Sequence, residues 1–331
     1  MTLRNAAFDA GLIRSRHIGV PVIAVGNMTA GGTGKTPLVE WVLQVLVRLG
    51  MHPAVVSRGY GRASRGVVVV ADHTRVIADA RQGGDEPVQI ARKFPGIPVV
   101  VGERRVDAAL TAVRNCGADV IVSDDGFQHR WLHRDLDVVV VTGVRALARE
   151  PMIPAGVRRE PMRGLRRAHV IAISGTQEPD DGSSVSRAGF AGSIVRMRRS
   201  IACIGEYANA VRHAPARLQG MRCFAFCGIG SPDRFFEDLR NAGAQLVGER
   251  RFRDHHMFSR DELREIARAA RAAGAEALIT TEKDVMRLDA DRAAVEPLFD
   301  GLPLLYPVLA VSVDPPGVLE QRIATIAGVQ G

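Results

Sequence analysis

Lysine is scarce in this sequence of 331 residues. Lys35, Lys93 and Lys283 stand against 41 arginines, so guanidinium groups carry almost all of the positive charge. Lysine offers a compact point charge, whereas arginine offers a planar fork of donors. A phosphate-binding loop uses the compact charge. This requirement suits the position of Lys35, although Lys93 lies in no such loop.

Cysteine and long apolar runs are also lacking. The four cysteines form no C-x-x-C pair, which favours structural thiols in a reducing cytoplasm over a metal or redox site. No run of about 18 apolar residues is present, so no membrane-spanning helix is predicted. The first 19 residues contain no signal-peptide core or cleavage pattern. A cytoplasmic location is therefore expected.

Aromatic residues make up only 5% of the chain, which bears on its charge of +8. Between Val144 and His169, seven arginines stand against two glutamates. Such a segment suits phosphate, anionic lipid or nucleic acid, and an ordinary solvated face is an equally good interpretation. Nucleic-acid binding commonly uses aromatic side chains on which bases stack, and no basic strand here is interleaved with aromatics. No nucleic-acid partner is predicted, and nothing indicates a protein partner.

Short apolar runs alternate with amphipathic segments, which predicts an α/β fold with a mainly parallel sheet and helices on both faces. The predicted strands are 20–25, 53–57, 66–70, 98–101, 120–123, 136–141 and 169–173, and the predicted helices are 36–49, 86–93 and 104–115. A smaller α/β unit follows the loop "SGTQEPDDGSSVS". It begins with the strand "MRCFAFCGIG" and a helix that has Ser231 as N-cap, Pro232 at its first position and Gly243 at its end. Two domains are expected, 1–200 and 201–331.

The segment "VIAVGNMTAGGTGKTPLVEWVL", residues 22–43, combines a buried strand, a glycine-rich turn and a helix. The rule G-x-x-x-x-G-K-[ST] requires glycine where this chain has Thr29. The remaining glycines allow the backbone to turn N–H groups toward an anion, and the helix N-terminus adds positive potential. Lys35 can reach the β- and γ-phosphates and the Thr36 hydroxyl can bind Mg²⁺. A nucleotide-binding P-loop is predicted.

Two further acidic motifs accompany the loop. "ADVIVSDDGFQH" places Asp124 and Asp125 at the end of a strand, where a P-loop protein holds its second metal anchor; a polar turn at Gly126 is the alternative. "RQGGDEPVQIAR" places Asp85 and Glu86 at the start of a helix. Taken alone, Asp85 is best interpreted as an N-cap, and only the company of the other motifs makes it a catalytic candidate.

The second unit contains "FRDHHMFS", with His255 and His256 adjacent to each other. Neighbouring histidines point in different directions and form a poor zinc site. One histidine from a second domain can instead complete an active site when the domains close. "TTEKD", residues 280–284, does not fit the [NT]-K-x-D guanine motif because one residue is misplaced.

In their order and spacing, seven motifs resemble the tetraacyldisaccharide 4'-kinase (lipid A 4'-kinase) family of Gram-negative bacteria. They are "GNMTAGGTGKTP", "SRGYGR", "GDEP", "VSDDGFQH", "PAGVRREP", "FRDHH" and "TEKD", and the resemblance runs from about Gly19 to Leu288. The family also begins its loop with threonine, so Thr29 is a family trait. The resemblance implies a P-loop kinase core joined to a smaller α/β domain.

The resemblance also implies a reaction and a location. With ATP and Mg²⁺, the enzyme would phosphorylate the 4'-hydroxyl of a tetraacylated glucosamine disaccharide 1-phosphate and give the 1,4'-bisphosphate, lipid IVA. It would act peripherally on the cytoplasmic face of the inner membrane. Family members commonly carry a longer apolar N-terminal helix, whereas about 18 residues precede the first strand here. Phe8, Leu12 and Ile13 form either a short interfacial helix or a helix packed on the domain.

Site residues follow from the resemblance position by position. ATP binding is assigned to Thr29, Ala30, Gly31, Gly32, Thr33, Gly34, Lys35 and Thr36. Mg²⁺ is assigned to Thr36, Asp124 and Asp125, with the choice between the two aspartates left open. Asp85 is the candidate base, paired with His255, while Lys35 holds the phosphates. The substrate side is assigned to Arg58, Tyr60, Glu86, Arg104, Gln128 and His129.

Two other functions use the same loop. A regulatory P-loop ATPase or GTPase switch would use Lys35 and Asp124 but would leave Asp85 and His255 without a task. A nucleic-acid-dependent ATPase would use the arginines between residues 144 and 169. The kinase is the interpretation that uses all of the motifs.

Overall fold

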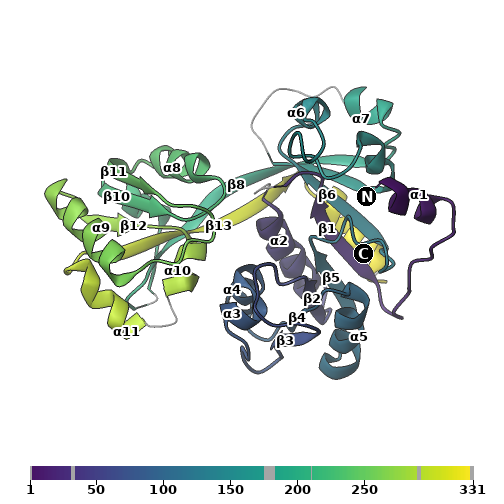
Figure 1. Cartoon of the computed structure of the whole chain (residues 1–331), viewed down its shortest axis with the longest axis horizontal. Coiled ribbons are helices and arrows are strands. Elements are labelled where there is room, and N and C mark those ends of the chain that lie inside the picture. The colour runs from purple at the N-terminus through teal and green to yellow at the C-terminus, as the bar shows by residue number, and fades with distance from the viewer. Residues whose placement is uncertain (1, 31–33, 175–182, 210, 289–291, 329–331) are drawn as a thin grey trace. The chain divides into compact units, whose positions relative to one another are not determined.

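The computed structural model describes the chain except for residues 1, 31–33, 175–182, 210, 289–291 and 329–331 (Figure 1). The chain forms two compact units. Unit 1 comprises Met1–Arg198 and Val311–Gly331, and unit 2 comprises Arg199–Ala310. Two long strands, β8 (Ser193–Glu206) and β13 (Leu304–Asp314), each contribute residues to both units.

Unit 1 is built on a largely parallel sheet with the strand order β8-β7-β6-β1-β5-β2-β4-β3. The strands are β1 (Val22–Asn27), β2 (Pro53–Ser57), β3 (Val68–Ala71), β4 (Val99–Val101), β5 (Val120–Asp124), β6 (Leu136–Val141) and β7 (Val170–Ile173), with β8 at one edge. β3 pairs antiparallel with β4, whereas β1, β2, β5, β6 and β7 pair in parallel with their neighbours. Residues of β1, β2, β4, β5 and β6 are buried throughout, as expected for parallel strands covered on both faces. The prediction of an α/β fold with a mainly parallel sheet is confirmed.

Helices cover both faces of this sheet (Figure 1). Helices α2 (Lys35–Arg48), α4 (Asp85–Lys93) and α12 (Val318–Ile326) share one apolar core with alternate residues of the central strands. Helix α5 (Arg105–Cys116) packs on the residues of the opposite face. The shorter elements are α1 (Thr2–Asp9), α3 (Ala80–Gly83), α6 (Val144–Arg149), η1 (Met162–Arg167) and α7 (Ser183–Arg187).

Unit 2 is a smaller α/β unit that is also built on parallel strands. Its strands β10 (Arg222–Cys227), β11 (Gln245–Arg251), β12 (Ala277–Ile279) and β13 follow the order β11-β10-β12-β13 and pair in parallel. Its remaining elements are β9 (Arg212–His213), η2 (Pro215–Leu218), α8 (Pro232–Asn241), α9 (Arg260–Ala272), α10 (Glu282–Leu288), α11 (Arg292–Val295) and η4 (Glu296–Phe299). Apolar clusters lie on both sides of the sheet.

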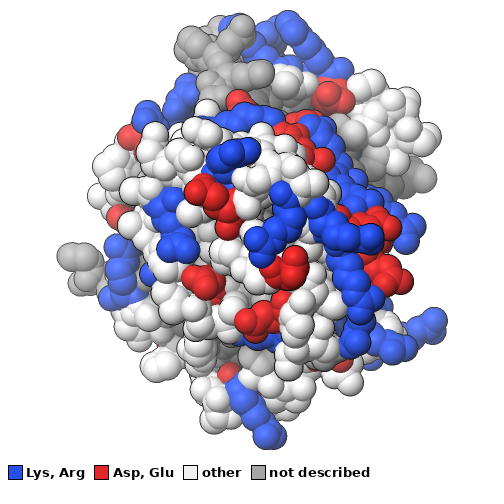
Figure 2. All heavy atoms as spheres, turned by 90° about the vertical axis from the view of Figure 1, so that its left-hand side faces the viewer, with Lys and Arg blue, Asp and Glu red and all other residues white. Residues whose placement is uncertain are grey.

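The surface of unit 2 carries many paired charges. Figure 2 shows a face on which basic side chains lie beside acidic ones. Exposed ion pairs of this unit join Arg250 to Glu265, Arg251 to Asp233 and Arg264 to Asp261. Because exposed pairs contribute little to stability, these charges serve solubility more than folding.

Two local predictions differ from the structure, and a third, the N-cap at Ser231, is confirmed. Asp85 is not the N-cap of α4, because Gly84 occupies that position and Asp85 is the first helical residue. Ser231 is the N-cap of α8 as expected, yet its side chain makes no capping hydrogen bond. Residues from Val311 onward belong to unit 1, whereas the sequence placed them in the second domain. They return because α12 packs on α2, where Arg48 and Glu320 form an ion pair of 3.0 Å.

The N-terminal helix packs on unit 1. Phe8 is 8% exposed and meets the Trp131 ring edge-on, with 5.1 Å between ring centres. Leu12, just beyond the helix, is 81% exposed. Within the described ranges, no helix combines the length and apolar character that crossing a bilayer requires.

Candidate active site

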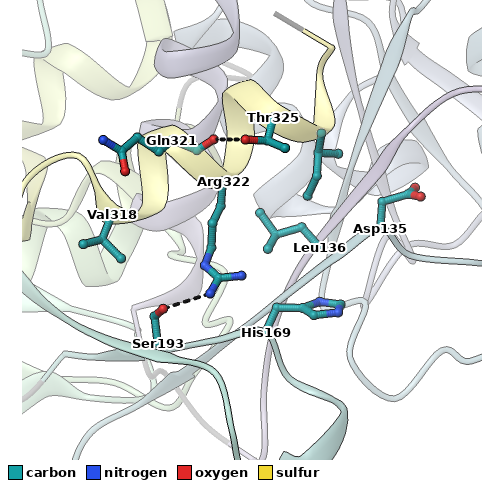
Figure 3. Close-up of a pocket in the computed structure, with 9 residues that line it drawn as sticks. Asp135, Leu136, His169, Ser193, Val318, Gln321, Arg322 and Thr325 are labelled. Carbon is teal, nitrogen blue, oxygen red and sulfur yellow. Dashed lines mark hydrogen bonds between the residues drawn. The ribbon is translucent and has the colours of Figure 1, made fainter. Parts of the chain in front are cut away.

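The two ends of the unit 1 sheet differ in character. The amino ends of β6, β7 and β8 border a cavity of about 450 Å³ (Figure 3). Its lining residues are Asp135, Leu136, His169, Ser193, Val318, Gln321, Arg322, Thr325 and Ile326. None of the predicted site residues lies there. Those of unit 1 follow the carboxyl ends of the strands or begin the next helix, where ligands bind in open α/β sheets.

The glycine-rich loop connects β1 to α2. Gly31, Gly32 and Thr33 lie outside the described residues. Gly34 is the N-cap of α2 and has a φ of 87°, a conformation that favours glycine. Lys35 and Thr36 are the first residues of α2, so their backbone N–H groups belong to the helix end that attracts anions.

A distant segment fixes the entry to this loop. The Ala30 N–H donates to the Val157 carbonyl and the Arg159 N–H donates to the Met28 carbonyl, both at 2.7 Å. Residues on either side of Thr29 are thereby held as in a short antiparallel ladder. The motif "PAGVRREP" therefore acts as a structural partner of the loop.

Asp124 ends β5 and is 1% exposed. Its Oδ1 atom is buried and has no hydrogen-bond partner among the described residues. Burial, reinforced by the negative charge of Glu86, raises the pKa of Asp124 to about 7. A buried carboxylate oxygen without a donor is well suited to a cation.

Asp125 has the opposite environment. The Arg159 Nη1 atom lies 2.9 Å from both of its oxygens, and the Lys35 Nζ atom lies 3.5 Å from Oδ1. Burial would raise the pKa of Asp125, but Lys35 and Arg159 outweigh it and hold that pKa below its ordinary value. Asp125 therefore organises the cations around the loop, whereas Asp124 keeps an oxygen available.

The described residues contain no cluster of three or more His, Cys, Asp or Glu side chains that could hold a metal ion alone. Mg²⁺ in nucleotide sites is commonly held by one or two carboxylates together with phosphate oxygens and water. Asp124 at the end of β5 fits such a partial ligand set, and Thr36 lies in the first turn of α2.

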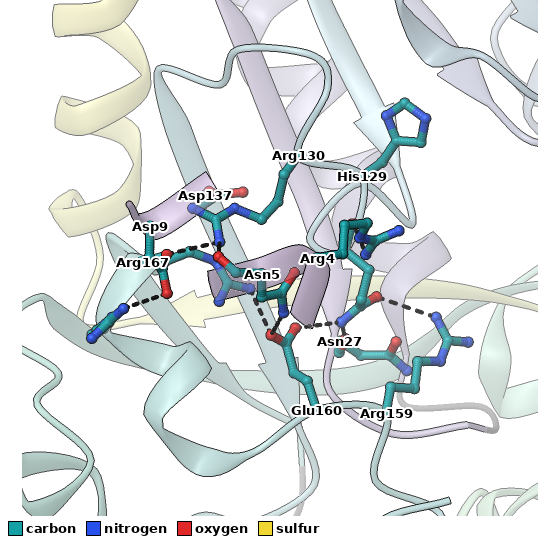
Figure 4. A network of polar contacts seen from close by, with 12 residues as sticks. Arg4, Asn5, Asp9, Asn27, His129, Arg130, Asp137, Arg159, Glu160 and Arg167 are labelled. Atoms are coloured by element: carbon teal, nitrogen blue, oxygen red, sulfur yellow. Dashed lines mark hydrogen bonds and ion pairs between the residues drawn. The ribbon is translucent and has the colours of Figure 1, made fainter. Parts of the chain in front are cut away.

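A buried polar network extends from this site to helix α1 (Figure 4). The Glu160 side chain is fully buried and accepts hydrogen bonds from Arg167, Asn5 and Gln128 at 2.7, 3.1 and 3.0 Å. The Gln128 amide also donates to the Asn27 carbonyl at 2.7 Å. The N-terminal helix and the end of β1 thus share one set of hydrogen bonds.

Close backbone contact joins the loop after β2 to the start of α4. A Cβ atom on Gly84, whose φ is 91°, would lie 3.1 Å from the backbone of Gly59 and from the Tyr60 carbonyl. A Cβ on Gly59 would lie 2.7 Å from the Gly83 carbonyl. Only glycine permits this approach, which brings "SRGYGR" beside "GDEP" and sets Asp85 and Glu86 at the helix start.

The remaining substrate-side residues differ in exposure. Arg58 is exposed, Tyr60 is 75% exposed and the Arg104 side chain is 79% exposed, so these three side chains are accessible to a ligand. His129 is partly buried, and burial together with the charge of Arg105 lowers its pKa to about 4. His129 is therefore neutral at physiological pH.

His255 lies in unit 2, in the turn between β11 and α9. Its side chain is 36% exposed. The neighbouring His256 has a structural role, because it stacks on Phe252 and hydrogen bonds to Glu262 at 3.1 Å. The two adjacent histidines thus have different environments.

Sequence reasoning missed three residues of this site. Arg159 and Glu160 lie in the motif "PAGVRREP", which indicates no role for either residue by itself. Arg105 is 4% exposed, and burial lowers its pKa to about 10, although Asp125 and Asp124 favour its charged form. A basic residue inside an apolar helix face was the available signal for Arg105.

The contrast between the two aspartates gives a test in metal-free buffer. The folded protein keeps a proton on Asp124 up to about pH 7, whereas an ordinary aspartate loses it near 3.8. Between these values the folded state binds more protons, so the free energy of unfolding decreases as pH rises. Asp124→Asn should remove this decrease and be more stable than wild type at pH 8 by about 2–4 kcal/mol.

Urea unfolding with EDTA at pH 5 and pH 8 measures this effect. Asp125→Asn is the matched variant and should be less stable than wild type at pH 8. The lowered pKa of Asp125 stabilises the folded protein at pH values above the pKa of an ordinary aspartate, and asparagine lacks this contribution. Equal pH dependence in wild type and Asp124→Asn would contradict the assignment of Asp124.

Known proteins of one family resemble this chain along most of its length. Residues 1–327 match the model of the family described as tetraacyldisaccharide-1-P 4'-kinase. A tetraacyldisaccharide 4'-kinase from Anaeromyxobacter sp. (strain Fw109-5) is 41% identical over 305 residues, which cover 88% of this chain and 80% of that protein. One from Geobacter metallireducens is 37% identical over 326 residues, covering 97% and 92%. The crystal structure of the "apo" form of LpxK from Aquifex aeolicus in complex with ATP is 27% identical, has a TM-score of 0.77, and covers 98% of this chain and 94% of its own.

Proposed function

The chain belongs to the tetraacyldisaccharide-1-P 4'-kinase family, and from this premise we propose which of its residues carry out the reaction. It is an ATP-dependent kinase of lipid A synthesis that uses Mg²⁺ and phosphorylates the 4' position of a lipid disaccharide. The observation that carries the assignment of roles is the buried oxygen of Asp124 at the end of β5, which has no hydrogen-bond partner among the residues that the structure describes.

Phosphate binding is assigned to the start of α2. Lys35 would contact the β- and γ-phosphates, and ATP binding is assigned to Thr29 to Thr36, of which residues 31–33 lie outside the described residues. Asp124 and Thr36 would hold Mg²⁺, which when bound neutralises phosphate charge. Asp125 orients Lys35 and Arg159, because it already contacts both cations in the protein.

Asp85 is assigned as the general base. A sugar hydroxyl is a weak nucleophile, and a carboxylate within hydrogen-bond reach accelerates its attack by about 10²–10⁴-fold. Asp85 accepts the proton of the 4'-hydroxyl while that oxygen bonds to the γ-phosphorus. The bond between the γ-phosphorus and the bridging oxygen breaks, and ADP leaves with the electron pair. His255 assists Asp85, a role that requires unit 2 to take part in the reaction.

The lipid substrate is assigned to the side chains that remain accessible around this site. Arg58, Tyr60 and Arg104 are exposed and can meet a phosphorylated sugar. Gln128 and His129 follow the end of β5, and Glu86 lies at the start of α4. The acyl chains require an apolar environment, which supports peripheral binding to the cytoplasmic face of the inner membrane. Neither nucleic acid nor a protein partner is required.

A direct assay tests this function. The purified protein is incubated with ATP, Mg²⁺ and the tetraacylated disaccharide 1-phosphate in detergent micelles, and the lipid is analysed by mass spectrometry. The expected result is a mass gain of one phosphate that disappears when Mg²⁺ is omitted. Folded protein that hydrolyses ATP without modifying the lipid would instead indicate the P-loop switch.

A further inference from the structure

The motif "TTEKD" of unit 2 has no task in the reaction described so far. Its last residue, Asp284, is fully buried. The carboxylate accepts hydrogen bonds from the Thr281 hydroxyl at 2.7 Å and the Gly228 N–H at 3.1 Å. It also forms an ion pair of 2.7 Å with Arg287, and the two side chains are 0% and 1% exposed. A buried pair of this kind is costly to desolvate, so its stability contribution alone is a weak reason for its presence.

Arg287 connects this pair to the histidine turn. Its Nη1 atom donates to Asp284 and, at 2.8 Å, to the Gly228 carbonyl. Its other arm, Nη2, lies 3.4 Å from the Nδ1 atom of His255. Because a guanidinium only donates hydrogen bonds, Nδ1 must accept. The contact therefore selects the neutral form of His255 that carries its proton on Nε2.

The backbone of His255 is held in an unusual conformation. Its φ is 60°, in the left-handed region that side chains other than glycine rarely adopt. The His255 N–H donates to the Gly228 carbonyl at 3.2 Å and to the Asp254 carboxylate at 3.0 Å. Gly228 thus contacts His255, Asp284 and Arg287 at once, and links the turn to the buried pair.

We propose that Asp284 and Arg287 are positioning residues that fix the ring orientation and the tautomer of His255 for phosphoryl transfer. Asp284 holds Arg287, and Arg287 holds the imidazole through Nδ1, which leaves the proton on Nε2, 3.9 Å from the Asp254 carboxylate. This rests on the proposed function, in which His255 assists Asp85. The motif "TTEKD" then serves catalysis through His255 rather than by contact with nucleotide.

Arg287→Lys is the informative change. A lysine at this position retains a cation for Asp284, so no buried charge is left alone, but it lacks the second arm that reaches Nδ1. We expect kcat for lipid phosphorylation to fall about tenfold, with the KM values for ATP and lipid within about twofold of wild type. The melting temperature should change little. Arg264→Lys, at an exposed ion pair of the same unit, is the matched control and should retain full activity.

A double-mutant cycle separates positioning from general stability. If Arg287 acts through His255, Arg287→Lys should change kcat by less than about twofold in a His255→Ala background. A tenfold loss of kcat on Arg287→Lys in both the wild-type and the His255→Ala background would overturn the proposal. It would also be overturned if Arg287→Lys kept full activity while His255→Ala lost activity. Full activity of His255→Ala itself would instead contradict the assigned role of His255. If Arg287→Lys does not fold, Asp284→Asn with Arg287→Gln keeps hydrogen-bonding groups without charge and is tested in the same cycle.

Discussion

Asp85→Asn is expected to lower kcat for lipid phosphorylation by about 10²–10⁴-fold, because an amide cannot accept the proton of the 4'-hydroxyl. The change preserves size and leaves the fold intact, since Asp85 is the half-buried first residue of α4 and Gly84, not Asp85, is the N-cap. ATP affinity should remain within a few-fold of wild type, because phosphate binding is assigned to Lys35 and its loop. The measurement is steady-state kinetics on the lipid acceptor with a separate determination of ATP binding.

Asp79→Asn is the matched control for this change. Asp79 caps the neighbouring helix α3, where its side chain accepts from the Gln82 N–H at 2.8 Å, and asparagine caps helices equally well. It should retain wild-type activity. If kcat of Asp85→Asn lies within about fivefold of wild type, Asp85 is not the general base. Its role would then be limited to the start of helix α4.

Lys35→Arg is expected to lower kcat by about 10²–10³-fold, the usual effect of losing one correctly placed, preorganised donor at a transition state. The substitution keeps the positive charge, so it asks whether a compact ammonium is required. The Lys35 side chain is 14% exposed and lies 3.5 Å from Asp125, which also pairs with Arg159. A larger guanidinium has little room there and would compete with Arg159 for the same carboxylate.

Lys93→Arg tests the same exchange where no phosphate is involved. Lys93 forms an ion pair of 2.6 Å with the buried Glu40, and arginine can form that pair as well. We expect near-normal activity for Lys93→Arg. If Lys35→Arg also retained normal activity, the scarcity of lysine in this chain would say nothing about its phosphate site.

Much of unit 1 was predictable because its signals are local. Parallel strands buried on both faces appear as short apolar runs, and the phosphate loop needs a strand, glycines and a helix start within one short segment. Strands 53–57 and 136–141 match the structure at both ends. β1 was placed two residues early, because pairing with β5 and β6, which sequence pattern does not encode, decides where a strand ends.

The sequence by itself determined the α/β fold, the P-loop with Lys35, and the set of motifs that identifies the family, since each depends on residues close together in the chain. Only the tertiary structure decided which aspartate stays available. Arg158 pairs with Thr29, and the adjacent Arg159 binds both oxygens of Asp125. Asp124 keeps an oxygen that has no hydrogen-bond partner in the described part of the chain. The tertiary structure also brought Gly228, Asp284 and Arg287 together with His255. It placed the C-terminal helix α12 in unit 1. Such contacts depend on the packing of segments far apart in sequence, which no local periodicity specifies.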